Sequence, residues 1–414
     1  MIFLNNIFFR GFCVFFISAF LAEFSFGNTN YDVSVPMTWS NRSYVLSDEG
    51  VNVSSTLRLS GKVKIKGGSL NLTGEGRIIL ERGSSVVFSG LSINAARIRP
   101  SSTGLVNYLI ELRGGRNSSL IIENSSFFVD IPYLASGQEK PWDQPPNYWL
   151  IGMRDVSENS GGTTQFILRN NRFLSAHAYA AGAIALRQTI TTKVKPKLAG
   201  EIASNEFQGF HGVITANSMQ RFKVSNNRLV KNSFANIFVG GHKVQVTGNR
   251  IYYPGNGTTG DGITVVDDFT DSLIDGNSIF VGSCYGMWIK SDYVNGLLIT
   301  NNTVVNGITT AIQVEGINNP VKNVMVKNNL ISGNKGFAIT FLGVESSSIE
   351  DNNFSDNAPG FPSQVYIERS PGLQISGNLS ATPLTPEWAT ENRLYRSHVN
   401  SADTTFTLPV VEAH

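Results

Sequence analysis

Hydrophobic and polar residues alternate in short segments through the second half of the chain, and an asparagine recurs between these segments. The marker asparagines follow one another at steps of 22 to 28 residues, at Asn205, Asn227, Asn249, Asn277, Asn302, Asn329, Asn353 and Asn378. Asn124 and Asn171 extend the series towards the N-terminus with longer gaps. A second apolar segment begins ten residues after four of the markers, at 237–239, 287–289, 312–314 and 339–341. A period of this length, with two or three strands and no helix per unit, is typical of the coils of a parallel β-helix.

The alternation predicts which side chains face the interior of each coil. Ile237 and Val239 are expected to point inwards and Phe238 outwards, and Trp288 is expected to point outwards between two buried neighbours. The marker asparagines are expected at a bend, where asparagine tolerates the left-handed backbone conformation. Their amides are also expected to hydrogen-bond from coil to coil, as asparagine ladders do.

Four segments follow from this pattern. Arg10, the apolar run 12–22 and the small residues Ser25 and Gly27 predict a signal peptide over 1–27, too short to span a bilayer. Residues 28–52 are expected to form an N-terminal cap, 53–380 the β-helix, and 381–414 a C-terminal cap or tail. The predicted fold class is all-β, a single-stranded right-handed parallel β-helix (a solenoid) with caps at both ends. The chain is expected to be exported, to the periplasm or the medium, without a transmembrane segment after cleavage.

Composition excludes several other classes of protein. Of the 414 residues only 15% are charged, and the formal net charge of +2 provides no general attraction for nucleic acid. Of the two cysteines, Cys13 lies in the predicted signal peptide, so Cys284 has no partner for a disulfide within the mature chain. The sequence gives no indication of an oligomeric state.

Stacked coils would place the outward residues of the second strands in vertical columns, with neighbouring coils ~4.8 Å apart. The candidate catalytic residues in and beside these columns are Arg187, His211, His242, Asp261, Asp267, Asp268, Tyr285 and Lys290. The candidate substrate-binding residues are Phe238 and Trp288 as stacking platforms, Asp292 and Glu315 near them, and Lys193 and Lys195 in an insertion between two markers. The two lysines would attract an acidic chain by local charge.

The asparagine-punctuated coils resemble the right-handed parallel β-helix proteins of the pectate-lyase-like superfamily over residues 53–380. This resemblance implies activity on polysaccharides, since the superfamily includes lyases, C5-epimerases and hydrolases, together with phage tailspikes and proteins of exopolysaccharide export. Segment 182–187 is similar to the strand that carries the catalytic arginine of alginate and chondroitin lyases, and segment 237–240 to a strand further along those enzymes. Their Lys-Ser motif has no counterpart upstream of Arg187.

The candidate residues suit two kinds of chemistry. β-Elimination at a uronate needs a cation for the carboxylate, from Arg187 or Lys290, a base, from His211 or His242, and an acid, from Tyr285 or Arg187. C5-epimerisation has the same first step. Hydrolysis by inversion needs two carboxylates ~6.5–9.5 Å apart, for which Asp261 with Asp267 or Asp268 is the available set.

No cofactor is expected. Calcium at Asp261, Asp267 or Asp268 is compatible with the ligand type but lacks a loop signature. The sequence therefore favours an exported lyase or C5-epimerase that acts on an acidic polysaccharide. A non-catalytic carbohydrate-binding or surface protein and a glycoside hydrolase on the same fold are the alternatives.

Overall fold

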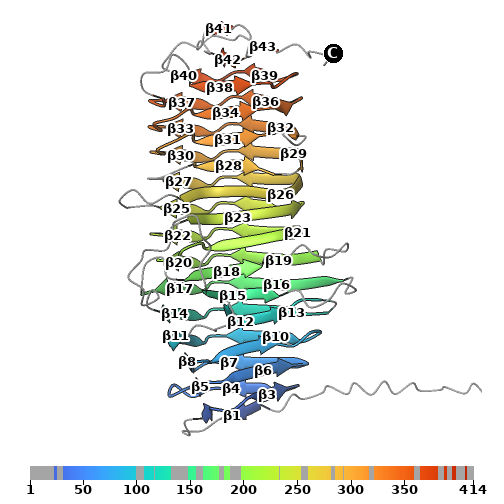
Figure 1. The fold of residues 1–414 in the computed structure, drawn as a ribbon, viewed down its shortest axis with the longest axis vertical. Coiled ribbons are helices and arrows are strands. Elements are labelled where there is room, and N and C mark those ends of the chain that lie inside the picture. Colours follow the sequence, from blue (N-terminus) through green and yellow to red (C-terminus); the bar gives the residue numbers. More distant parts are fainter. Residues whose placement is uncertain are drawn as a thin grey trace, which may run out of the picture.

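The computed structural model describes residues 23–25, 31–98, 107–115, 117–131, 148–154, 162–176, 181–186, 197–232, 234–252, 260–280, 285–291, 293–316, 321–358, 364–380, 387–388, 394–397 and 406–407. These residues form short strands stacked into one long rod, with the N-terminal coils at one end and the C-terminal coils at the other (Figure 1). No helix among them is long and apolar enough to cross a membrane. The rod is a right-handed parallel β-helix, in the hand that connections between parallel strands favour.

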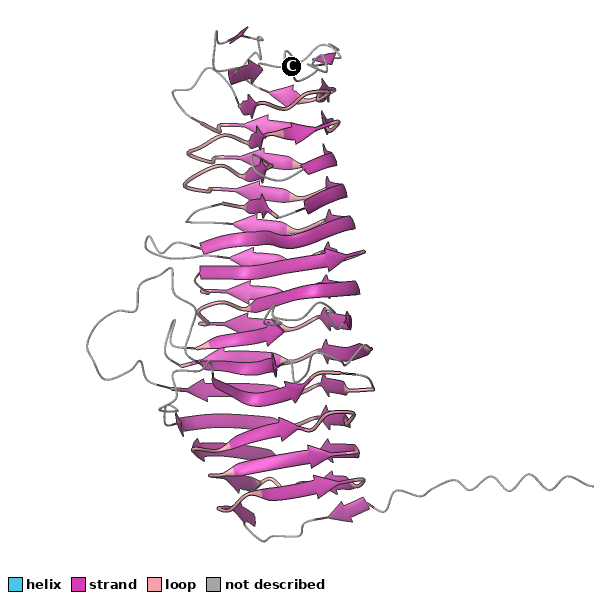
Figure 2. Cartoon of the chain, turned by 45° about the vertical axis from the view of Figure 1, so that its right-hand side comes forward, coloured by secondary structure: helices cyan, strands magenta, loops and turns pink. Residues whose placement is uncertain are grey.

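Each coil contributes strands to three faces of the rod, which we number in the order in which β3, β4 and β5 occur along the chain (Figure 2). Face 1 contains β3 (Met37–Ser40), β6 (Thr56–Ser60), β9 (Arg77–Leu80), β12 (Asn107–Arg113), β15 (Tyr148–Arg154), β18 (Gly182–Leu186), β23 (Phe234–His242), β28 (Met287–Lys290), β31 (Ile312–Glu315), β34 (Ile339–Leu342) and β38 (Val365–Glu368). Two long strands, β21 (Ile214–Ser225) and β26 (Gly260–Asp275), continue from face 1 onto face 2.

Faces 2 and 3 complete the coil. Face 2 contains β1 (Glu23–Ser25), β4 (Ser43–Val45), β7 (Lys62–Lys66), β10 (Ser85–Ser89), β13 (Ser119–Glu123), β16 (Thr163–Arg169), β19 (Lys197–Ala203), β24 (Gln245–Thr247), β29 (Tyr293–Thr300), β32 (Val321–Lys327), β35 (Val344–Glu345), β36 (Ser348–Glu350) and β39 (Gln374–Ser376). Face 3 contains β2 (Tyr31–Val33), β5 (Val51–Val53), β8 (Ser69–Gly74), β11 (Ser92–Ile98), β14 (Ser126–Asp130), β17 (Arg172–Ser175), β20 (Glu206–Gln208), β22 (Arg228–Val230), β25 (Arg250–Tyr252), β27 (Ser278–Phe280), β30 (Thr303–Val305), β33 (Leu330–Ser332), β37 (Asn353–Ser355) and β40 (Leu379–Ser380).

Alternation along each strand fills the interior of the rod with apolar side chains. Ile237, Val239, Met287 and Ile289 are fully buried, as predicted from the second apolar segments. Inward residues of successive coils stack on one another, and an aromatic column runs through Phe127, Phe173 and Phe207 with ring centroids 4.4 and 4.7 Å apart. The core is therefore one continuous cluster along the axis.

The predicted asparagine ladder exists at the turn before face 3. In each step the backbone N–H and the side-chain amide of one asparagine both donate to the Oδ1 of the next, as from Asn205 to Asn227 at 3.0 Å. The ladder runs through Asn171, Asn205, Asn227, Asn249, Asn277, Asn302, Asn329, Asn352 and Asn378. All of them are at most 3% exposed, so the ladder satisfies polar groups that have lost water.

Two details of the predicted ladder were wrong. Asn353 is exposed and its neighbour Asn352 occupies the ladder, while Ser125 rather than Asn124 holds the corresponding position below Asn171. The left-handed conformation also belongs to the residue before each ladder asparagine, such as Asn170 at φ 55° or Asp351 at φ 51°. An Asn-Asn dipeptide fits both roles, so the one-residue offset is decided by which side chain points into the core.

The described residues at the two ends of the rod show how the stack of coils begins and ends. Parallel pairing begins before residue 53, because β2 pairs with β5 and β3 with β6, so part of the predicted N-terminal cap is a coil. Residues 23–25, within the predicted signal peptide, pair with β4. At the other end β42 (Leu394–Ser397) and β43 (Phe406–Thr407) run antiparallel to β38 and β39, and β41 (Glu387–Trp388) pairs with β42. These antiparallel strands end the parallel stack.

Candidate functional site

Five of the predicted site residues meet on face 1, and we call them the Trp288 cluster: Asp261, Tyr285, Trp288, Lys290 and Glu315. Asp261 lies near the start of β26, Tyr285 two residues before β28, Trp288 and Lys290 on β28, and Glu315 at the end of β31. The strands are adjacent, with Thr264 opposite Trp288 and Trp288 opposite Gln313. Three consecutive coils therefore supply one surface cluster.

Contacts around the indole hold the cluster together. The Tyr285 ring lies 5.1 Å from the Trp288 ring between centroids, and Lys290 Nζ lies 4.6 Å from the centroid of the same indole. The indole Nε1 donates to Glu315 Oε2 at 3.2 Å. The tyrosine and the ammonium group are thus brought within about 10 Å of each other, on a surface that a cation–π contact and a hydrogen bond keep in place.

Among the described titratable groups, Asp261 has the most strongly shifted pKa. Its carboxylate accepts from Thr264 Oγ1 at 3.0 Å and from the backbone N–H of Tyr285 at 3.3 Å. Burial disfavours the charged form more than these two hydrogen bonds favour it, and the pKa of Asp261 rises from 3.8 to about 6. A carboxyl group that titrates near neutrality is suited to accepting and returning a proton.

The remaining described candidates lie outside this cluster. Phe238 is half-buried in the same outward column, opposite Thr264. His211 is 6% exposed just before β21, two coils below β26. His242 lies round the corner of the coil, opposite Thr270, and its Nδ1 is 2.8 Å from the hydroxyl of that residue. His242 is therefore not brought together with Asp261, whereas His211 lies two coils away from it.

Four further predicted residues, Arg187, Lys193, Lys195 and Asp292, lie outside the described residues. Cys284 lies there as well.

The carboxylate pair expected for hydrolysis is too widely separated. Asp261 and Asp267 are six residues apart on the extended strand β26, which at ~3.3 Å per residue places their backbones roughly 20 Å apart. Asp268 is one residue further and exposed at the corner. Inverting hydrolysis requires ~6.5–9.5 Å, so these aspartates do not form the predicted pair. Among the described residues, no three His, Cys, Asp or Glu side chains gather as a metal site.

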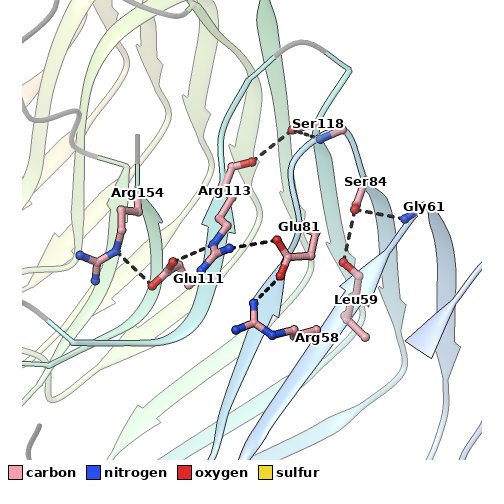
Figure 3. Close-up of polar contacts among 10 residues, drawn as sticks. Arg58, Leu59, Gly61, Glu81, Ser84, Glu111, Arg113, Ser118 and Arg154 are labelled. Atoms are coloured by element: carbon pink, nitrogen blue, oxygen red, sulfur yellow. Dashed lines mark hydrogen bonds and ion pairs between the residues drawn. The ribbon is translucent and has the colours of Figure 1, made fainter. Parts of the chain in front are cut away.

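A charged network on the N-terminal half of face 1 was not predicted from the sequence (Figure 3). Glu81 pairs with Arg58 and, at 3.0 Å, with Arg113, while Glu111 pairs with Arg113 at 3.4 Å and with Arg154 at 3.1 Å. The side chain of Glu111 is only 6% exposed. The available signal was the opposite charge of outward residues on neighbouring strands, but the register that joins them is not visible in the sequence.

A separate polar groove of about 1060 Å³ follows the turn between faces 2 and 3 on the lower coils. Its walls carry the amides and hydroxyls of residues such as Asn170, Ser204 and Asn226. Arg172 and Arg228 also line it, and both pair with Glu206. None of the predicted site residues lines this groove.

The chain is similar to known proteins over part or most of its length. Residues 202–379 match the model of a family described as periplasmic copper-binding protein (NosD). No curated protein sequence matches the chain. Similar solved structures include the periplasmic alginate epimerase AlgG, with 9% identity, TM-score 0.44 and coverage of 83% of this chain and 78% of that chain. An alginate lyase of family PL6 in complex with a trisaccharide has 13% identity, TM-score 0.40 and coverage of 91% and 86%.

The catalytic unit of a GH87 α-1,3-glucanase from Streptomyces thermodiastaticus has 12% identity, TM-score 0.44 and coverage of 80% and 62%. The pairing of its strands makes the protein a parallel β-helix, and residues 202–379 resemble the NosD family.

Proposed function

We propose that the protein acts on an acidic polysaccharide at the Trp288 cluster, by β-elimination or C5-epimerisation of its uronate units. The observation that carries the proposal is a chain of contacts on adjacent strands, which runs from Lys290 over the Trp288 indole to Tyr285 and from the Tyr285 backbone to Asp261, a carboxyl group of raised pKa. The resemblance of the coils to polysaccharide-active β-helix proteins supports the substrate class. The predicted signal peptide and the periplasmic location of the family that residues 202–379 match support export to the periplasm or the medium.

The residues have distinct roles in this reaction. Lys290 would pair with the uronate carboxylate and stabilise the negative charge that develops when the C5 proton leaves. Asp261, ionised above about pH 6, would accept that proton. In elimination the C4–C5 double bond forms, the C4–O bond breaks, and the Tyr285 hydroxyl donates its proton to the departing oxygen. In epimerisation the carbanion is reprotonated at C5 from the opposite face.

The test is incubation of the purified protein with alginate, pectate and glycosaminoglycans. Elimination raises the absorbance of unsaturated uronate together with new reducing ends, whereas epimerisation exchanges C5 hydrogen for deuterium, seen by NMR. Lys290→Gln should lower kcat/KM roughly 100-fold, because transition-state charge loses its partner. Lys62→Gln, an exposed lysine on β7, is the matched control and should leave the rate unchanged. Reducing ends without unsaturation would overturn the proposal in favour of hydrolysis.

A carbohydrate-binding protein without catalysis is the second candidate. The observation that favours it is the position of Lys290 Nζ against the indole ring, where a cation–π contact already occupies the ammonium group. Binding of alginate, lost in Trp288→Ala, with neither bond cleavage nor C5 exchange would establish this function.

A further inference from the structure

Three exposed cations gather on face 2, and we call them the face 2 basic cluster: Arg221, Lys223 and Lys243. They surround a hollow of about 390 Å³, whose lining is completed by Gln245, Asp271 and Leu273. The hollow lies on β21, β24 and the second half of β26, apart from the Trp288 cluster.

The fold holds these cations close together. The pairing of β21 with the next coil keeps one register, with Gln220 opposite His242 and Lys223 opposite Gln245. The same register sets Arg221 beside Lys243, so their backbones are about one coil spacing apart, ~4.8 Å. Both residues adopt the left-handed conformation, at φ 54° and 55°, which is unfavourable for residues with a Cβ.

The closeness of the three cations lowers the stability of the fold, and no ion pair among the described residues offsets this loss. Like charges on neighbouring strands repel each other, and within the described part of the chain no carboxylate forms an ion pair with any of the three cations. Elsewhere on the rod, Arg228 pairs with Glu206, and Lys327 with Glu350 and Asp351. The nearest carboxylate of the hollow, Asp271, directs its Oδ2 to His242 Nδ1 at 3.6 Å. The hollow therefore has an excess of positive charge.

We propose that this hollow is a second binding site, which takes a carboxylate or sulfate group of an anionic glycan. Arg221, Lys223 and Lys243 would pair with the anion, the Gln245 amide would hydrogen-bond to sugar hydroxyls, and Leu273 would contact the apolar side of the ring. A small concave hollow suits a single sugar unit better than a flat lipid surface. The choice of a glycan as the bearer of the anion rests on the proposed function.

The second site is distinct from the first. Thr264, which contacts Asp261, and Leu273 lie nine residues apart on β26, with left-handed residues Asp267 and Asp271 between them. The chain changes direction there, so a straight polysaccharide cannot occupy both places. The hollow would bind a second chain, or a chain that bends round the rod, and would hold the protein on its substrate.

The experiment compares alginate binding by calorimetry in the full-length protein, the triple variant R221Q/K223Q/K243Q and the control K62Q/K64Q/R250Q. Both variants lose three positive charges, but the control residues do not line the hollow, since two lie on β7 of face 2 and one on β25 of face 3. The first variant should bind at least about tenfold more weakly, with a smaller dependence of affinity on salt, and the control should bind as the unchanged protein does. The thermal midpoint of the first variant should not fall, because repulsion is relieved.

Equal binding by the first variant, or an equal loss in the control, would overturn the proposal. Binding to phosphatidylglycerol vesicles that depends on the face 2 basic cluster, without binding to alginate, would show that the partner is a lipid surface and not a glycan. Inorganic sulfate should compete with alginate, because the anionic group is what the cations recognise. Failure of the proposed catalysis is seen separately, because Asp261→Asn should retain binding at the hollow. If all polysaccharides are left uncleaved and unexchanged while the cluster still binds alginate, the catalytic proposal alone fails.

Discussion

At the scale of single residues, the burial of the Asp261 carboxyl group lowers the stability of the folded state. Asp261 is kept in surroundings that favour its neutral form, although a more exposed carboxylate would cost less. Because the folded-state pKa of about 6 lies above the ordinary value of 3.8, the folded state binds the proton more tightly than the unfolded state. Asp261 therefore destabilises the fold increasingly as pH rises through this window.

Asp261→Asn gives a prediction in which activity and stability move in opposite directions. The variant should lose roughly 100-fold or more in rate, because the proton acceptor is gone. At pH 8 it should unfold at the same or a higher temperature than the unchanged protein, and this gain should be much smaller at pH 4 and vanish only below the ordinary pKa of 3.8, where the aspartate is protonated in both states. Thermal scans at the two pH values measure the difference in unfolding temperature between the variant and the parent. A difference that is less favourable to the variant at pH 8 than at pH 4 would contradict the prediction.

The rate of the unchanged protein should depend on the same titration. Since Asp261 must be ionised to accept the C5 proton, kcat/KM is expected to rise as pH increases through about 6 and then to level off. A pH profile with alginate as substrate measures this rise. A rate that falls over the same interval would assign a different group as the base.

The ladder offers a matched pair of residues. Asn352→Ala removes the side-chain acceptor of the Asn329 backbone N–H, one of the three acceptors of the Asn329 amide, and the amide donor to the Val326 carbonyl. Because all these groups are buried, the free energy of unfolding should fall by about 2–3 kcal/mol. Asn353→Ala removes an exposed side chain one position away and should change it by less than about 0.5 kcal/mol. Denaturant titrations measure the free energy of unfolding of both variants. Equal changes would show that the hydrogen bonds of the ladder do not contribute to stability.

At the scale of elements, the charged network of Figure 3 joins neighbouring strands of face 1 by ion pairs and so stabilises the stacking of the coils. Glu111 on β12 is almost inaccessible and joins an arginine on its own strand to Arg154 on β15. Glu201 pairs with Arg169, but that arginine is half exposed. Loss of the carboxylate is therefore expected to change the free energy of unfolding more at Glu111 than at Glu201, because Glu111 is buried and the partner of Glu201 is half exposed to water.

Glu111→Ala should accordingly destabilise the protein by about 1–3 kcal/mol, since two arginines lose a buried partner. Glu201→Ala should cost less than about 1 kcal/mol, because its partner is solvated without it. Chemical denaturation of both variants provides the comparison, and adding salt should weaken only the second effect.

At the scale of the whole molecule, the rod ends where antiparallel strands cover its last coil. A chain truncated after residue 380 would leave the edges of β38 and β39 unpaired, and such edges recruit other strands. The truncated protein should therefore self-associate end to end, and light scattering on a chromatography column measures its mass. A monomeric product would show that these strands are not needed as a cover.

The fold and part of the site could be predicted from the sequence. The parts that could be predicted depend on the local repeat, and the parts that could not depend on packing between distant segments. The repeat of apolar positions determines which side chains are buried, so the coils and the outward position of Trp288 followed from local pattern. The offset between Asn352 and Asn353 did not, because both residues suit a tight turn and only packing against the interior separates them. The hydrolytic carboxylate pair failed likewise, since closeness in sequence became distance along an extended strand.

The repeat in the sequence was enough to predict that this chain winds into stacked coils and which residue types line their outer wall, because periodicity and backbone preference act locally. Which of those residues share a surface became clear from the folded structure alone. The register between coils joins Asp261, Tyr285 and Trp288, separates them from His242, and sets Arg221 beside Lys243. Register depends on contacts between segments more than twenty residues apart, which no local pattern contains.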